Sequence, residues 1–156
     1  SLSSKCNISF ILGGYGIDKH NHELVSLLNK YGIPDMQCRL IGPVLEKKEF
    51  FDQIDLFVLH SRSESFPNVL LEAIAFKKLC VTTDVGCAKE LLNDTDDVVE
   101  VQNPNQMAEK FVEMINIGDD AVKHKVETNY KNAYSLYNVD LTVSKYEDYI
   151  LSTLNR

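Results

Sequence analysis

Two glutamates with seven residues between them, Glu64 and Glu72, are the side chains that point most directly to a binding site. Glu72 lies in the stretch 69–75, VLLEAIA, which is apolar nearly all round and predicts a buried helix. A buried carboxylate is costly unless something binds it, so Glu72 should meet a cation, several donors or the hydroxyls of a ligand. A structural ion pair with Arg62 or Lys89 is the alternative, and periodicity alone leaves both open.

Glu64 belongs to the loop that precedes this helix. Pro67 suits the first helical position, and the amides of Asn68 and Val69 would then lie in the first turn, where they have no intrahelical acceptor. Such a helix end binds phosphate readily. Glu64 and Glu72 could therefore grip two ends of one ligand. Alternatively, Glu64 is solvated and only favours the positive end of the helix, which is worth ~0.3–1 kcal/mol.

The elements that position these residues follow from alternating short apolar runs and helical patterns, which predict an α/β fold: a Rossmann-like parallel sheet flanked by helices. The 156 residues suit one domain. Ligands of open α/β sheets bind beyond the carboxyl ends of the strands, so the loops 13–18, 42–46 and 60–68 are candidates. The expected strands are 8–12, 36–41, 54–59, 79–83 and 98–101, and the expected helices are 23–28, 46–53, 67–78, 105–117, 121–137 and 141–154.

Composition and motifs argue against several classes of function. The net charge is −7 and no basic block is present, so we expect no nucleic-acid partner. The glycines of 13–16 fit neither the GxGxxG spacing of dinucleotide enzymes nor a phosphate loop. The histidines form no metal-ligand cluster, and we expect no metal and no other cofactor.

Four cysteines, Cys6, Cys38, Cys80 and Cys87, lack CxxC pairing. Free thiols in a reducing cytosol are the favoured interpretation, over a disulfide or metal framework. No apolar stretch approaches the ~20 residues that a membrane span needs. We therefore expect a cytoplasmic chain without an export signal.

The stretch 55–92, DLFVLHSRSESFPNVLLEAIAFKKLCVTTDVGCAKELL, closely resembles the signature region of family 4 glycosyltransferases. Residues 64–72, ESFPNVLLE, match the family's E-x7-E motif, and EAIA at 72–75 and TDVG at 83–86 continue the match. The segment 11–44, with GYGID and LIG, also looks like enzymes that build bacterial surface polysaccharides. The resemblance implies the C-terminal, donor-binding half of a retaining GT-B glycosyltransferase that works without a metal.

The resemblance also assigns roles to the two glutamates. Glu64, as a binding residue of the catalytic centre rather than a nucleophile, and the backbone of Ser65 and Phe66 would hold the hydroxyls of the donor sugar. Glu72 would bind the ribose hydroxyls of the nucleotide, which would account for its burial.

The remaining carried-over positions concern the diphosphate and the base. After Pro67, the amides of Asn68 and Val69 would face the diphosphate. The loop around Pro43 and Val44 would lie near the base.

The implied activity is retaining transfer of a hexosyl or N-acetylhexosaminyl residue from a UDP-sugar, or secondarily a GDP-sugar, to a glycan or lipid-linked acceptor in bacterial surface polysaccharide synthesis. A non-catalytic nucleotide-sugar-binding module and a GT-B-type nucleotide-sugar epimerase remain alternatives. Family members carry a further strand, a basic diphosphate loop and an acceptor domain before the equivalent of residue 8. We therefore expect a fragment, truncated at its N-terminal edge, that folds but does not transfer sugar alone. Peripheral attachment to the inner face of the membrane through the missing domain stays open.

Three positions depart from the family pattern. Ser65 stands where a glycine normally lets the donor approach closely. The usual ACG after the second glutamate reads AFK at 75–77, and the second glycine after TDV is Cys87. The first departure affects the donor contacts, whereas the others should be tolerated in packing.

Overall fold

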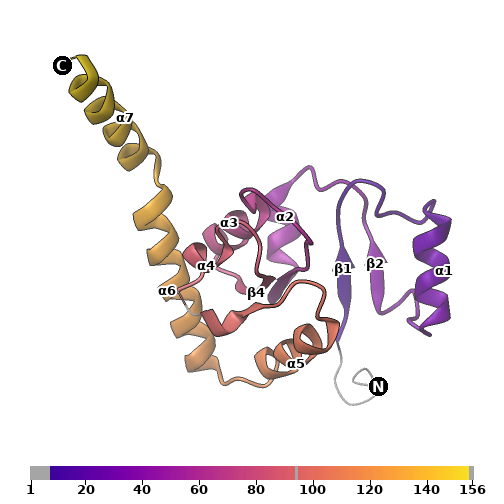
Figure 1. Ribbon diagram of the computed structural model, residues 1–156. Coiled ribbons are helices and arrows are strands. Elements are labelled where there is room, and N and C mark those ends of the chain that lie inside the picture. Colours follow the sequence, from indigo (N-terminus) through magenta and orange to yellow (C-terminus); the bar gives the residue numbers. More distant parts are fainter. Residues whose placement is uncertain (1–7, 94, 155–156) are drawn as a thin grey trace. The chain divides into compact units, whose positions relative to one another are not determined.

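A computed structural model describes residues 8–93 and 95–154, without the side chain of Thr95 (Figure 1). The chain divides into two compact units, Ser1–Ile54 and Asp55–Arg156. Each unit contains parallel strands and helices, and each is described by itself. The assignment of all 156 residues to one domain stays a prediction.

The first unit is a βαβα segment. Its helix α1 begins after Asn21, whose side chain accepts a hydrogen bond from the Leu24 amide, and ends before Gly32, whose φ of 65° suits a glycine. Both residue types are readable in the sequence as signals of a helix start and a helix end. Phe10 lies opposite Cys38 in the parallel strand pair. The elements are β1 (Phe10–Leu12), α1 (His22–Lys30), β2 (Cys38–Leu40) and α2 (Lys47–Asp52).

The second unit contains a three-stranded parallel sheet in the order β3 (Leu56–Leu59), β4 (Leu79–Thr83) and β5 (Val98–Val99). All five residues of the central strand β4 are buried. In β3, Phe57 is buried and the other three residues are half-buried. The apolar run 54–59 suggests a strand buried on both faces, but β3 is only partly buried because it lies at the edge of its sheet.

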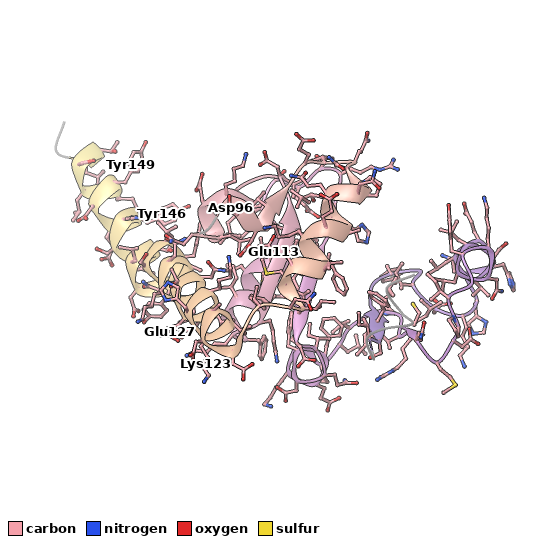
Figure 2. The ribbon with its side chains drawn as sticks, turned by 90° about the horizontal axis from the view of Figure 1, so that it is seen from below. Asp96, Glu113, Lys123, Glu127, Tyr146 and Tyr149 are labelled. Atoms are coloured by element: carbon pink, nitrogen blue, oxygen red, sulfur yellow. The ribbon has the colours of Figure 1, made fainter. Side chains whose placement is uncertain are left out.

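Helices surround this sheet (Figure 1). The helix α3 contacts β3 and β4, α5 contacts β4 and β5, and α6 contacts α3, α4 and β4. The helix α7 follows α6 after one residue and buries none of its side chains; Tyr146 and Tyr149, labelled in Figure 2, are exposed on it. The bounds are α3 (Asn68–Ala75), α4 (Ala88–Leu91), the 3₁₀ turn η2 (Thr95–Asp97), α5 (Pro104–Met114), α6 (Asp119–Tyr137) and α7 (Val139–Leu154).

The core of the second unit follows from strand alternation. Leu79 and Val81 of β4 pack with Val99 and Met114, while Cys80 and Thr82 point to the opposite face. Partly buried apolar side chains extend this cluster: Leu56, Met107, Ile117, Val122 and Val126. The central strand is thus packed on both faces, which holds in place its carboxyl end, where the loops begin.

A buried ion pair ties η2 to α6. The carboxylate of Asp97 is completely buried, and both of its oxygens accept hydrogen bonds from the ammonium of Lys125 at 3.0 Å. The Lys125 side chain is 18% exposed. The pair therefore satisfies a charge that would otherwise be stranded in the core.

Cys38, Cys80 and Cys87 carry free thiols, and Cys6 lies outside the described residues. Burial raises the pKa of the Cys80 thiol strongly, and the nearby carboxylate of Asp97 raises it further. Cys87 is only half-buried. Because the thiolate is the reactive form, Cys80 should be inert while the protein is folded.

A thiol reagent should therefore modify Cys87 in the native protein and leave Cys80 intact until denaturant is added. Mass-spectrometric mapping of the two peptides checks this. A Cys87→Ser variant serves as control, and modification of native Cys80 at the rate of Cys87 would contradict the described burial.

Candidate functional site

The candidate site lies where β3 and β4 end. Both strands are parallel, so the loop 60–67 that follows β3 and the turn 84–87 that follows β4 leave the same edge of the sheet. Gly86 has a φ of +51°, and a Cβ atom there would lie 2.6 Å from the carbonyl oxygen of Ser65 and 2.9 Å from that of Glu64. A glycine is therefore needed to let the turn press against the backbone of the loop.

The Glu64 side chain is half-buried and accepts one hydrogen bond, whose donor, Ser61, is itself held by a second. The Ser61 hydroxyl donates to Oε1 of Glu64 at 2.8 Å. The buried Thr83 hydroxyl, at the end of β4, donates to the Ser61 carbonyl at 2.7 Å. The carboxylate is thus connected to the central strand through Ser61.

The start of α3 differs in detail from the expectation. Pro67 is buried and occupies the N-cap, with φ −78° and ψ 76°, so its placement at the first helical position is wrong by one residue. The reason is local: the amide of Asn68 donates to the carbonyl of Phe66 at 2.9 Å, which closes a turn before the helix begins. Among the described residues, the Val69 amide has no hydrogen-bond acceptor. Of the two amides predicted to face a diphosphate, only that of Val69 is available without exchanging a bond.

Glu72 is half-buried rather than fully buried. The helix places a stripe with Leu70, Ala73 and Ile74 in the core, whereas Ala75 is exposed. The prediction of a helix buried all round is therefore wrong. Glu72 lies beside the buried stripe and is partly exposed.

The suggested ion-pair partners of Glu72 are not confirmed. Lys89 pairs with Asp84 of the same turn that carries Gly86. Arg62 is exposed on the loop. Lys89 is therefore engaged with Asp84, and the assignment of Glu72 as a ligand-binding carboxylate stays a prediction.

Phe66 contacts an aromatic residue of α6, which the sequence did not predict. Its half-buried ring meets the ring of Tyr137, at the end of α6, edge to face with 5.2 Å between centroids. The Tyr137 hydroxyl donates to Glu90 at 3.3 Å. Burial, together with Cys87 and Glu90 nearby, raises the pKa of Tyr137 to about 12, so the phenol stays protonated at neutral pH. Ser65, between Glu64 and Phe66, is exposed.

Pro43 and Val44 belong to the first unit, where Pro43 is exposed and Val44 half-buried. A Cβ atom on Gly13 would lie 2.7 Å from the Val44 side chain. The Gly14 amide also donates to the Gly42 carbonyl at 2.8 Å. The structure thus brings together two of the three candidate loops, 13–18 and 42–46. The contact of Pro43 and Val44 with a base stays a prediction.

Two observations concern a metal site and a membrane span. The described residues include no group of three or more His, Cys, Asp or Glu side chains placed to hold a metal ion. Within the same residues, each helix is too short or too polar to cross a membrane.

Sequence reasoning missed three contributors to the site: Ser61, Gly86 and Tyr137. Gly86 belongs to the TDVG stretch at 83–86, but its contact with the loop depends on the register of β3 against β4. Ser61 follows a strand and precedes Glu64 by three residues, a spacing that allows a side-chain hydrogen bond without requiring it. No sequence signal connects Tyr137 with Phe66, because most of the residues of the second unit lie between them in the sequence.

Comparisons with known proteins fit this geometry. A family model described as glycosyl transferases group 1 matches residues 2–116. The O-antigen biosynthesis glycosyltransferase WclY of Escherichia coli is 25% identical, over 86% of this chain and 41% of its own length. The uncharacterized glycosyltransferase MJ1178 of Methanocaldococcus jannaschii is 36% identical over 46% of this chain and 21% of its own.

Solved structures share the fold. A glycosyltransferase from Rickettsia africae matches with a TM-score of 0.83 and 20% identity, over 98% of this chain and 42% of that one. Anabaena Alr3699/HepE, in complex with UDP and glucose, matches with a TM-score of 0.76 and 20% identity, over 95% and 41%. The fold class is therefore confirmed as the α/β half of a GT-B molecule. The chain spans about two fifths of the length of WclY and of the Rickettsia glycosyltransferase.

Proposed function

Because this chain belongs to the glycosyl transferases group 1 family, we propose that it binds the nucleotide-sugar donor of a sugar transfer, through the loop 60–67 and the start of α3. The observation that carries the proposal is the fixed Glu64 carboxylate, which Ser61 holds at 2.8 Å ahead of a helix start. A positioned acceptor for sugar hydroxyls thereby precedes amides that suit a diphosphate.

Each part of the donor has a proposed partner. The Glu64 carboxylate accepts hydrogen bonds from the sugar hydroxyls, and the backbone of Ser65 and Phe66 holds the same hydroxyls. The amide of Val69 meets the diphosphate, joined by that of Asn68 once its bond to Phe66 is exchanged. The carboxylate of Glu72, one helical turn further on, accepts hydrogen bonds from the ribose hydroxyls.

The chemistry proposed for this end of the helix is stabilisation of the leaving diphosphate. Backbone N–H groups that point to a developing negative charge lower the barrier without reorganising during the reaction. Glu64 acts as a binding residue that orients the sugar. Retention of the anomeric configuration and independence from metal are parts of this proposal that stay predictions.

For the donor we propose a UDP-activated hexose or N-acetylhexosamine, with GDP as the second choice. The presence of UDP and glucose in HepE, which shares the fold, supports UDP. The similarity to WclY, a glycosyltransferase of O-antigen biosynthesis, supports a glycan or lipid-linked acceptor and a role in bacterial surface polysaccharide synthesis. We propose that the acceptor binds an N-terminal domain of the whole enzyme and that the reaction takes place in the cytoplasm.

Replacing Glu72 with alanine should weaken nucleotide binding about 30-fold, because hydrogen bonds to a charged group contribute about 2 kcal/mol. Calorimetric titration with UDP, GDP, UDP-glucose and UDP-N-acetylglucosamine measures this and identifies the base.

The matched control is Glu109→Ala, which removes an exposed glutamate from α5 and should leave every affinity unchanged. Equal affinities in the Glu72 variant and the parent protein would refute the ribose contact. A folded parent protein that binds neither nucleotide series at millimolar concentration would refute the proposed function.

A further inference from the structure

We propose that Ser61 is a positioning residue for the donor sugar: its hydroxyl sets the orientation of the Glu64 carboxylate, and Thr83 sets the position of Ser61. The inference rests on the proposed function and names two further residues that this function needs. Neither Ser61 nor Thr83 is assigned a contact with the donor.

The first step is the bond between the two side chains. A free glutamate samples many rotamers, and a carboxylate that must meet particular sugar hydroxyls loses that freedom on binding. The Ser61 hydroxyl, 2.8 Å from Oε1, removes part of this freedom before the ligand arrives. One bond from a hydroxyl uses a fraction of the roughly four lone-pair positions on a carboxylate, so acceptor capacity remains for the sugar.

The second step is the connection of Ser61 to the sheet. The Ser61 carbonyl accepts a hydrogen bond of 2.7 Å from the hydroxyl of Thr83, which is 4% exposed and ends the fully buried strand β4. Threonine is branched at Cβ and has few rotamers, so this donor is stiff. The position of Ser61 is thereby tied to the fully buried strand β4 as well as to its own loop.

The third step is the constraint from the opposite direction. Gly86 approaches the carbonyl groups of Glu64 and Ser65 so closely that even a methyl group would not fit. The side chain of Glu64 is thus held by Ser61 while its backbone is held by Gly86. Together these contacts fix the backbone and the side chain of Glu64, the residue proposed to bind the donor sugar.

The ratio of nucleotide-sugar affinity to nucleotide affinity distinguishes a positioning role of Ser61 from a general effect on the stability of the loop. For each variant, calorimetry gives the affinities for UDP and for UDP-glucose or UDP-N-acetylglucosamine, whichever the parent protein binds more tightly. Ser61→Ala should lower the ratio of nucleotide-sugar to nucleotide affinity about tenfold and leave the UDP affinity within twofold of the parent value. Ser61→Thr, which keeps a hydroxyl, should restore the ratio.

The same loop offers a matched control. Ser63 is exposed, and Ser63→Ala should leave the ratio unchanged. Thr83→Val, an isosteric change, should lower the ratio in the same direction as Ser61→Ala, and circular dichroism confirms that it folds. In a Glu64→Ala background, Ser61→Ala should have no further effect on the ratio, because the side chain that it positions is gone.

The outcomes distinguish this inference from the proposed function. If Glu64→Ala lowers the ratio but Ser61→Ala does not, or if Ser61→Ala weakens UDP and the nucleotide sugar equally, the positioning role is overturned and the donor site stands. If Glu64→Ala itself leaves the ratio unchanged, the sugar contact of Glu64 is refuted and the role of Ser61 falls with it.

Discussion

Replacing Gly86 with alanine should lower the free energy of unfolding of the second unit by about 2–4 kcal/mol and abolish measurable binding of a nucleotide sugar. The left-handed φ of +51° costs a non-glycine residue about 1 kcal/mol. The added methyl group would also lie 2.6 Å from the Ser65 carbonyl oxygen, which is backbone and cannot rotate away, so overpacking adds about 1–3 kcal/mol. The loop that carries Glu64 must then move.

Denaturant unfolding and calorimetry measure the two effects. The control is Gly118→Ala, because Gly118 has a φ of −72° and nothing within 4 Å of the added carbon. Because Gly118 is the N-cap of α6, where alanine is less favourable than glycine, the substitution should change stability by less than about 1 kcal/mol. A Gly86→Ala protein with parental stability and parental affinity would show that the turn 84–87 does not press on the loop.

Replacing Asp97 with asparagine should lower the free energy of unfolding by about 3 kcal/mol. The substitution keeps the shape of the side chain but leaves the ammonium of Lys125, which is 18% exposed, without its charged partner, and breaking a buried pair in this way costs about 3–5 kcal/mol. Because η2 leads directly into β5, loss of the ion pair should also destabilise β5, the strand that pairs with β4. Thermal and denaturant unfolding check the size of the effect.

The exposed pair of Lys89 and Asp84 in the same unit provides the comparison, since their side chains are 54% and 47% exposed. Asp84→Asn should cost less than about 1 kcal/mol, as exposed pairs do. Similar losses from Asp97→Asn and Asp84→Asn would mean that burial does not govern the Asp97 pair.

Local signals predicted most of the elements. Asn21 and Gly32 bound α1 as capping chemistry requires, and the alternation of short apolar runs with helices predicted the parallel sheets. The four-residue helix α4 was missed because so short a segment contains about one turn and therefore no period.

The helix end at 75–77 shows why one departure from the family pattern is tolerated. Lys77, at the place of the usual glycine, has a φ of +55°. Its ammonium lies 3.2 Å from the Glu127 carboxylate, labelled in Figure 2, and 4.7 Å from the centroid of the Tyr130 ring. These contacts with α6 offset part of the strain, and they bring together residues far apart in the sequence, so local pattern reasoning could not find them.

The sequence predicted which residues to consider for the candidate site, but not how they are arranged. The spacing of Glu64 and Glu72 selected one loop and the helix that follows it, yet the degree of burial of Glu72 depends on which stripe of α3 faces the core. The sequence offers Ser61 and Ser63 as equal neighbours of Glu64, and the turn of the backbone decides that Ser61 donates the bond.

The most direct test of the donor site is a map of backbone amide chemical shifts during titration with UDP-glucose, UDP-N-acetylglucosamine and UDP alone. UDP should perturb the amides at the start of α3, above all Val69, and the sugar should add perturbations at Glu64, Ser65 and Gly86. Binding that leaves residues 61–72 and 84–87 unperturbed while shifting amides elsewhere would contradict the proposed donor site.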